Sequence, residues 1–397
     1  MHPITIRFPF RPARRSLATG QVADLFGLAD EEPAHVIADG VDLGIRPGDL
    51  VLITGPSGSG KSSLLRAAGR QLGAIDVMGF DIPDLSLVDA LPGSVDERLK
   101  LLAACGLSEA RLLLRTPGEL SDGQRYRFRL AYALARGEQW LLADEFAANL
   151  DRTLAKVLAF NLRKLITRTR IGMLLATTHD DLIDDLRPDL LVRCREAEVS
   201  QVRDERAREP RAISFSGELR MEDGSASDWP RFARWHYRGH KLCFVKRVVL
   251  LKHGMEPIGI CVFTAPAASL GIRTRYFGLH GARSRIALSA LNDQLWLLSR
   301  VVIHPTYRGA GIAAHFVRQA CVSCRVPWIE TLTAMGHANP IFERAGFTRV
   351  GVVRKDGDGL GYGGQFGPTG KCNDASRGKS RWSEPVYYVW DNRRRGY

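Results

Sequence analysis

The stretch DLVLITGPSGSGKS, residues 49–62, decides the fold of the first part of the chain. Its first six residues suit a short buried strand, glycine and serine fill its middle, and a helix pattern over 61–72 follows. Glycines in such a turn let successive backbone N–H groups point at one anion, and the helix dipole favours negative charge at the same place. The stretch therefore predicts a phosphate site between a strand and a helix.

These residues also match the P-loop pattern in full. The pattern implies that the loop and the start of the helix contact the nucleotide through Gly55, Ser57, Gly58, Gly60, Lys61, Ser62 and Ser63. Lys61 is expected to reach the β- and γ-phosphates, and Ser62 is expected to ligate Mg²⁺. ATP and Mg²⁺ are therefore the expected ligands.

Strand and helix patterns alternate around this loop. Strands are expected over 35–45, 49–54, 140–143 and 172–177, and helices over 61–72, 95–115, 123–136 and 153–169. Such alternation predicts an α/β domain with a parallel sheet and with its ligand at the carboxyl ends of the strands.

Four short motifs follow the loop in a fixed order. They are Leu120-Ser121-Asp122-Gly123-Gln124, Leu141-Leu142-Ala143-Asp144-Glu145, Asn149-Leu150-Asp151 and Thr178-His179-Asp180. Over residues 36–195 the chain resembles the ABC ATPases, whose signature, Walker B strand, D-loop and switch histidine come in this order. The resemblance implies that Asp144 holds Mg²⁺, that Glu145 polarises the attacking water and that His179 senses the γ-phosphate.

The resemblance also implies an ATP-dependent homodimer, because the signature of one subunit faces the P-loop of the other. Ser121, Gly123, Gln124 and Asp151 are the expected contacts. Two features depart from the family: Asp122 stands where glycine is usual, and MGFDIPDLSLVDAL, residues 78–91, has no glutamine where the Q-loop belongs. Asp81 or Asp84 could contact the metal instead. The short Q-loop region argues against transport, so no membrane partner is expected.

A second strand–loop–helix pattern begins with LLSRVVI, residues 297–303, and continues into HPTYRGAGIA, residues 304–313. It resembles motif A of the GNAT acetyltransferases, with Arg308, Gly311 and Ala313 at the core positions. The resemblance implies that the loop binds the pyrophosphate of acetyl-CoA at a helix N-terminus. The expected cofactor contacts further include Val302, Gly309, Ile312 and Asn339.

The GNAT resemblance covers about residues 211–395, and the sequence after this loop adds to it. WIETLTAM, residues 328–335, is expected to be the next, splayed strand, and a helix is expected to end at Ala345-Gly346-Phe347. The domain is therefore expected to be α+β, with an N-acetyl transfer activity. Glu330 and His337 are the candidate general bases, and a structural role is the alternative for each.

The charge of the chain is concentrated in its second part. The formal net charge is +13, with −2 over residues 1–210 and +15 over residues 211–397. WPRFARWHYRGHK, residues 229–241, interleaves aromatic and basic side chains, and Arg377, Lys379, Arg381 and Arg393–Arg395 add further positive charge. Such a composition suits RNA binding. The alternative is a first helix whose rings pack in the core while its charges are solvated.

Composition limits the remaining possibilities. Seven scattered cysteines form no disulfide or zinc framework, and no stretch is apolar enough to span a membrane, so a cytoplasmic protein is expected. The expected organisation is an ATPase domain over 1–200, a linker over 201–210 and an acetyltransferase domain over 211–397.

Three functions stay open: an ATP-coupled acetyltransferase of RNA, an acetyltransferase of a small molecule or protein that the ATPase regulates, and an ATPase with a non-catalytic polyanion-binding module.

Overall fold

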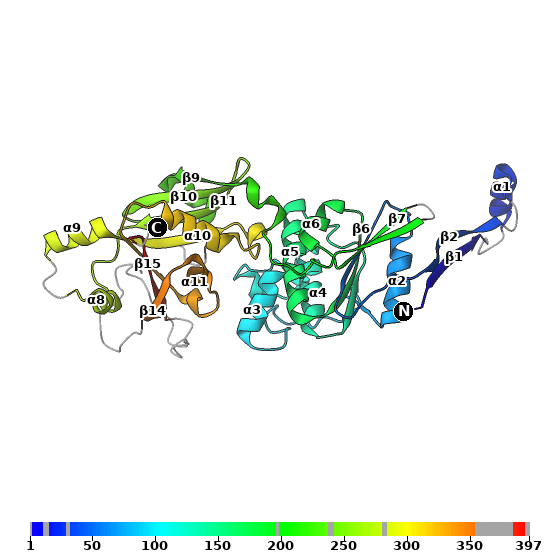
Figure 1. Cartoon of the computed structure of the whole chain (residues 1–397), viewed down its shortest axis with the longest axis horizontal. Helices are drawn as coiled ribbons and strands as arrows, with labels where there is room; N and C mark the ends of the chain where they lie inside the picture. Colours follow the sequence, from blue (N-terminus) through cyan, green and yellow to red (C-terminus); the bar gives the residue numbers. More distant parts are fainter. Residues whose placement is uncertain are drawn as a thin grey trace. The chain divides into compact units, whose positions relative to one another are not determined.

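The computed structural model describes residues 2–10, 16–28, 32–195, 198–236, 242–279, 284–353 and 384–393. The chain divides into two compact units, Met1–Ser214 and Phe215–Tyr397, and each has its own sheet (Figure 1). Several predicted features lie outside the described residues: Tyr237 to Lys241, most of the loop over 354–385, and Arg394 and Arg395.

The first unit is built on a six-stranded sheet in the order β4-β5-β6-β3-β7-β8. The strands are β3 (Leu50–Thr54), β4 (Ile75–Asp76), β5 (Trp140–Ala143), β6 (Gly172–Thr177), β7 (Leu190–Arg195) and β8 (Glu198–Arg203). All neighbours are parallel except β8, which runs antiparallel to β7. The predicted strands β3, β5 and β6 therefore lie side by side at the centre, and the expected α/β fold is confirmed.

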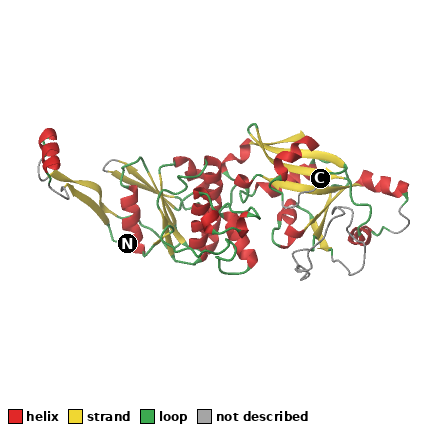
Figure 2. Ribbon diagram, turned by 180° about the vertical axis from the view of Figure 1, so that it is seen from behind, coloured by secondary structure: helices red, strands yellow, loops and turns green. Residues whose placement is uncertain are grey.

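Helices cover both faces of this sheet (Figure 2). They are α2 (Lys61–Leu72), α3 (Val95–Ala104), α4 (Asp122–Ala135), α5 (Arg152–Thr169) and the short α6 (Ile183–Leu186). Side chains alternate along β3, so Leu50 and Leu52 pack in one core with α4 and α5, while Val51 and Ile53 pack in another with α2. The helix expected over 95–115 ends at Ala104, and the three-residue 3₁₀ helices η1 (Leu112–Leu114) and η2 (Pro117–Glu119) precede α4.

A two-stranded sheet precedes the phosphate loop. β1 (Ile4–Phe10) pairs antiparallel with β2 (Glu32–Val41), and α1 (Leu17–Phe26) lies between them in the chain (Figure 1). The sequence predicted the strand around β2 but not its partner. Ile4 is buried against the core that contains α2, so the end of this hairpin belongs to the first unit.

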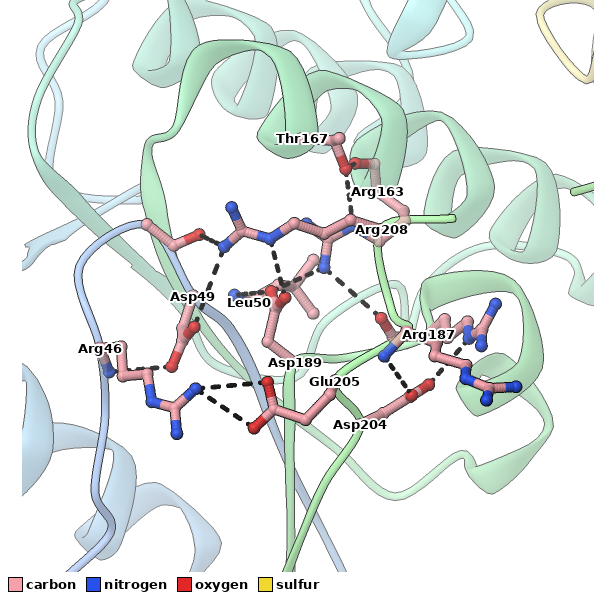
Figure 3. Close-up of polar contacts among 12 residues, drawn as sticks. Arg46, Asp49, Leu50, Arg163, Thr167, Arg187, Asp189, Asp204, Glu205 and Arg208 are labelled. Atoms are coloured by element: carbon pink, nitrogen blue, oxygen red, sulfur yellow. Dashed lines mark hydrogen bonds and ion pairs between the residues drawn. The ribbon is translucent and has the colours of Figure 1, made fainter. Parts of the chain in front are cut away.

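The predicted linker over 201–210 belongs to the first unit. β8 includes its first three residues, and Arg203 at the end of the strand pairs with the buried carboxylate of Asp49. Arg208, beyond the strand, pairs with the buried carboxylate of Asp189 (Figure 3). Arg203 lies 3.0 Å from Asp49, and Arg208 lies 3.0 Å from Asp189. These ion pairs explain why a charged stretch is held against the sheet, and the boundary of the unit falls later, at Ser214.

The second unit is built on a seven-stranded sheet in the order β14-β15-β13-β12-β11-β10-β9. The strands are β9 (Leu219–Gly224), β10 (Val245–His253), β11 (Glu256–Thr264), β12 (Leu295–Ile303), β13 (Trp328–Thr333), β14 (Thr348–Val352) and β15 (Val386–Asp391). The helices are α7 (Trp229–Ala233), α8 (Gly271–Phe277), α9 (Arg285–Gln294), α10 (Ile312–Val322) and α11 (Ile341–Ala345). The 3₁₀ helices are η4 (Ser214–Glu218), η5 (Ala226–Asp228), η6 (Pro305–Tyr307) and η7 (Ala334–His337).

The central strands of this sheet diverge. β12 and β13 are parallel and pair only where Leu295–Leu297 faces Trp328–Glu330. Further along, β12 continues its pairing with β11, and β13 continues its pairing with β15. The two strands therefore part at their carboxyl ends, just before η6 and α10.

Among the described residues, we find no helix that is both long and apolar enough to cross a lipid bilayer.

Candidate functional site

The loop between β3 and α2 has a backbone that requires glycine. Gly55, Gly58 and Gly60 have φ values of 148°, 80° and 85°. A Cβ atom at Gly55 would lie 2.1 Å from the backbone oxygen of Cys194, so no larger residue fits there. The loop is thus fixed in its course by the strand beside it.

This backbone leaves N–H groups available for an anion. Within the described part of the chain, no backbone carbonyl accepts the N–H groups of Gly58, Gly60, Lys61 or Ser62. No side chain caps the N-terminus of α2, where the helix dipole is positive. The Lys61 ammonium donates to the Pro56 carbonyl at 2.6 Å, which holds it over the loop. Together these groups fit a polyphosphate.

A hydroxyl and a carboxylate meet beside the loop. Ser62 Oγ donates to Asp144 Oδ1 at 3.0 Å, and Arg66 lies 3.4 Å from the other Asp144 oxygen. No cluster of three or more His, Cys, Asp or Glu side chains suited to a metal occurs in the described ranges. Ser62 and Asp144 therefore fit a cation such as Mg²⁺ that takes its other ligands from water and phosphate oxygens.

The residue after Asp144 has a strained backbone. Glu145 has a φ of 52°, and its side chain is exposed. Its N–H donates to Asp144 Oδ1 at 3.1 Å, and Ala147, which also has a positive φ, donates its N–H to Tyr126 Oη at 3.3 Å. Strain of this kind is typical of functional sites.

His179 follows β6 at the same edge of the sheet. It is half-buried, and its N–H donates to Thr177 Oγ1 at 3.2 Å. The next residue, Asp180, accepts a hydrogen bond from Thr54 at the end of β3. The histidine segment is therefore hydrogen-bonded to the end of β3, directly before the phosphate loop.

The signature residues form the start of α4. Ser121 is the N-cap: its Oγ accepts from the Gln124 N–H at 3.4 Å, and the Gln124 side chain accepts from the Ser121 N–H at 3.1 Å. Asp122 is exposed and approaches Arg125 at 3.4 Å. Asp151 caps α5 by accepting from Leu154 at 2.9 Å.

The segment that replaces the Q-loop is held by its backbone. Arg129 donates to the carbonyl oxygens of Met78 and Phe80 at 3.0 and 3.1 Å. Asp81 and Asp84 are exposed, and the Asp144 carboxylate has Ser62, Arg66 and the Glu145 N–H as its partners among the described residues.

A second anion-type loop lies in the Phe215–Tyr397 unit, after β12. Gly309 and Gly311 have φ values of 89° and 82°, and Gly311 is the N-cap of α10 without a side-chain cap. No carbonyl in the described residues accepts the N–H groups of Gly309, Gly311 or Ile312. Arg308 donates to the Ile303 carbonyl at 2.9 Å and to the Trp235 carbonyl at 3.3 Å, which ties the loop to β12.

The other predicted cofactor contacts are placed differently. Val302 and Ile312 are buried, so their side chains pack in the core and only their backbone could meet a ligand. Ala313 is half-buried in the first turn of α10. Asn339 is exposed, and its N–H donates to the Met335 carbonyl at 2.8 Å.

The candidate base Glu330 lies in the core. It is 0% exposed, with one oxygen 3.0 Å from Arg273 and the other accepting from Tyr387 at 2.9 Å. Burial raises the pKa of the Glu330 carboxyl, and the nearby Arg273 offsets this only in part. A general base must reach the proton that it removes. The burial and the ion pair of Glu330 therefore favour its structural alternative over the role of general base. The sequence signalled neither Arg273 nor Tyr387 as its partner.

His337 remains at a reachable position. It is half-buried in η7, directly after β13, and its Nε2 lies 2.8 Å from the Glu384 carbonyl. Because a carbonyl oxygen only accepts, Nε2 carries the proton in this contact.

In the described part of the aromatic and basic stretch, residues 229–236, two aromatic rings pack in the core while the basic groups lie at the surface. Trp229 and Phe232 are buried in a core with Val248, so these rings are unavailable for stacking on bases. The basic groups stay at the surface: Arg231 pairs with Glu256, and Arg234 stacks on Trp235 at 4.3 Å from the ring centroid.

Comparison with known proteins gives relatives for part of the chain. The chain is 32% identical over 198 residues to the lipoprotein-releasing system ATP-binding protein LolD of Novosphingobium aromaticivorans. This match covers 40% of the present chain and 87% of the relative. The lipoprotein-releasing system ATP-binding protein LolD of Granulibacter bethesdensis is 31% identical over 225 residues, and the match covers 46% of the present chain and 96% of the relative. A solved dimeric structure of an ATP-binding cassette bound to ADP and phosphate is 19% identical, with a TM-score of 0.37. The superposition covers 51% of the present chain and 97% of the cassette. No family model matches the chain.

Proposed function

The chain belongs to the ABC ATPase family, and from this premise we propose that it couples ATP hydrolysis to acyl transfer from acetyl-CoA. The first unit carries the ATPase and the second unit carries the acyltransferase. The observation that supports the second activity best is the parting of β12 and β13 directly before the loop of Arg308 and Gly311.

In the ATPase, each residue has a role that its position supports. The free N–H groups of the loop and Lys61 bind the phosphates, and Ser62 and Asp144 would hold Mg²⁺. Bound Mg²⁺ would supply neutralisation of the phosphate charge. Glu145 orients the attacking water, and His179 contacts the γ-phosphate.

The ATP-bound form is proposed to be a homodimer, because each chain has one P-loop and one signature. Ser121, Gly123, Gln124 and Asp151 would contact the partner's nucleotide. No membrane partner is proposed, since residues 78–91 lack the Q-loop glutamine. Recovery of the native protein in a stable complex with an integral membrane protein would contradict this part.

The dimer can be tested with Glu145→Gln, which leaves the loop intact but removes the carboxylate. We expect this variant to hold ATP and to elute as a dimer when ATP and Mg²⁺ are present. Glu145→Gln combined with Lys61→Ala is the control, because it should lose the nucleotide and stay monomeric. A Glu145→Gln protein that binds ATP but remains a monomer would contradict the model.

In the acyltransferase, the loop N–H groups of Gly309, Gly311 and Ile312 bind the pyrophosphate, and Arg308 holds the loop in place. The neutral amine of the acceptor attacks the thioester carbonyl. The C–N bond forms first and gives a tetrahedral oxyanion that backbone N–H groups hold, and the C–S bond breaks when the oxyanion collapses. The proton that the amine nitrogen loses passes to the base and then to the sulfur, so coenzyme A leaves as the thiol. His337 remains the candidate base, because Glu330 is buried.

The acceptor is proposed to be RNA. The support is the net charge of +15 over residues 211–397, which favours polyanions. Base stacking by Trp229 and Phe232 does not contribute, since both are buried. Small amines and proteins are the alternative acceptors, and a non-catalytic polyanion-binding module is the alternative to transfer.

The experiment is incubation of the protein with labelled acetyl-CoA and with RNA, protein or polyamines, each with and without ATP. Label in RNA that requires ATP and is lost in Lys61→Ala would support the proposal. Label in another fraction would assign a different acceptor. Bound acetyl-CoA without transfer to any fraction would reduce the second unit to a binding module.

A further inference from the structure

The segment from His179 to the end of α6 contacts the nucleotide site at its start. Asp180 accepts a hydrogen bond from Thr54, the last residue before the phosphate loop. Asp181 pairs with Arg152, which directly follows Asp151, and the Arg152 Nε lies 3.1 Å from its carboxylate. The last residue before the phosphate loop and the first residue of α5 therefore both contact this segment.

The same segment holds the end of the first unit. Asp185 in α6 is 0% exposed, and both of its oxygens bind Ser214. Oδ1 accepts the Ser214 N–H at 2.8 Å, and Oδ2 accepts the Ser214 hydroxyl at 2.6 Å. Charge-assisted hydrogen bonds of this kind are stronger than neutral ones, so two of them on one residue fix its position. We call this contact the Asp185–Ser214 clamp.

The next residue, Phe215, is anchored in the second unit beside the Arg308 loop. Its ring stacks on His253 at a centroid distance of 5.0 Å and meets Tyr307 edge-on at 5.7 Å. His253 Nδ1 lies 2.9 Å from Tyr307 Oη, and its Nε2 lies 2.9 Å from Glu218. Tyr307 directly precedes Arg308 in the chain. Phe215 is therefore packed against the residue that begins the loop.

We propose that the Asp185–Ser214 clamp transmits the nucleotide state of the first unit to the acetyl-CoA loop of the second. The proposal rests on the proposed function of both units. Each contact in the path lies within one unit, and the Ser214–Phe215 peptide bond joins the two halves. Because coupling between two ligands is reciprocal, ATP should change the affinity for acetyl-CoA by the same factor by which acetyl-CoA changes the affinity for ATP.

The path is tested in the full chain with Asp185→Asn and Ser214→Ala, both in a Glu145→Gln background that retains ATP. The measurement is the Kd of acetyl-CoA with and without ATP. We expect a difference of about fivefold or more in the background protein, the lower range of known couplings. Asp185→Asn should bring the ratio to about one, and Ser214→Ala, which keeps one hydrogen bond, should reduce it.

Asp184→Asn is the matched control, because Asp184 is the neighbouring residue but is exposed. This variant should keep the full ratio between the acetyl-CoA Kd values measured with and without ATP. Ser214 is also exposed, so its variant should fold even if Asp185→Asn does not. A ratio of one in the background protein, or a full ratio in both clamp variants, would overturn the inference.

Hydrogen exchange separates this inference from the proposed function. ATP should change the exchange of peptides that cover residues 214–220 and 303–312 in the Glu145→Gln background, and this change should be lost in Asp185→Asn. If acetyl-CoA fails to bind, the proposed acyltransferase is wrong, yet the exchange experiment still tests the clamp. An equal ATP effect on residues 303–312 with and without the clamp would refute it.

Discussion

Asp189 shows at the scale of one residue how the first unit is held together. Its carboxylate accepts the Leu50 N–H at 2.8 Å and lies 2.7 Å from Arg163 and 3.0 Å from Arg208 (Figure 3). Burial alone would raise the pKa of Asp189, but the hydrogen bonds from Arg163 and Leu50 outweigh it and lower that pKa below the usual range. The ionised form is therefore the one that the fold requires.

Asp189→Asn should lower the free energy of unfolding by about 3 kcal/mol at neutral pH, because it leaves the buried Arg163 without its counter-charge. The folded-state pKa lies below the unfolded value of about 3.9, so this stability is present above that pH and is lost as the pH falls through the folded pKa. Urea unfolding at neutral pH and near pH 3 measures it. Asp184→Asn is the control, and an equal loss at both pH values would contradict the argument.

Glu330 shows that the sequence around a residue does not reveal its burial or its ion-pair partner. Its position on a strand beside the splay was predictable, since WIETLTAM is an apolar strand after motif A. Its burial was not, because the ion-pair partner Arg273 comes from α8, 57 residues earlier. A carboxylate cannot be assigned as base or as structural ion until its partners are known.

At the scale of elements, prediction succeeded where local pattern alone decides the structure. α2, β5 and β6 have the predicted bounds, because the two strands are largely apolar runs and α2 is capped by Gly60 before its first residue and by Gly73 after its last. β8 was missed because its exposed and charged residues resemble a linker. The ion pairs that hold this stretch join Arg203 to Asp49, directly before β3, and Arg208 to Asp189, directly before β7. Both carboxylates lie outside the stretch whose local pattern was interpreted.

The loop before α10 provides the prediction at this scale. Gly311→Val places a β-branched residue at a φ of 82° and crowds the N–H groups at the helix start. We expect the affinity for acetyl-CoA to fall by about tenfold or more, equivalent to about 1.4 kcal/mol, with ATP hydrolysis unchanged. Gly278→Val is the matched control: Gly278 has a φ of 63° and open space around its Cβ position, so it tests strain alone. Equal affinity in the two variants would remove the loop from the cofactor site.

At the scale of the whole molecule, the chain combines two units that differ in sheet, core and charge. The first has a mainly parallel sheet and almost no net charge over residues 1–210, while residues 211–397 carry +15. Each sheet has its own buried core, so each unit has its own source of stability. The sequence indicated this division, because one glycine-rich loop lies in the first half of the chain and the other lies in the second half.

Two separate cores predict two ligand-specific unfolding transitions. ATP with Mg²⁺ at about 100 times its Kd should stabilise the first unit by about 2.7 kcal/mol, and acetyl-CoA at the same excess should stabilise the second unit by a similar amount. For units of this size each midpoint should rise by roughly 5–10 °C, measurable by calorimetry. Lys61→Ala should abolish only the ATP shift, and Gly311→Val only the acetyl-CoA shift. A Gly311→Val protein that keeps its acetyl-CoA shift, or a wild-type protein without one, would leave the second unit with no acetyl-CoA site, and its positive charge would then have to serve binding alone.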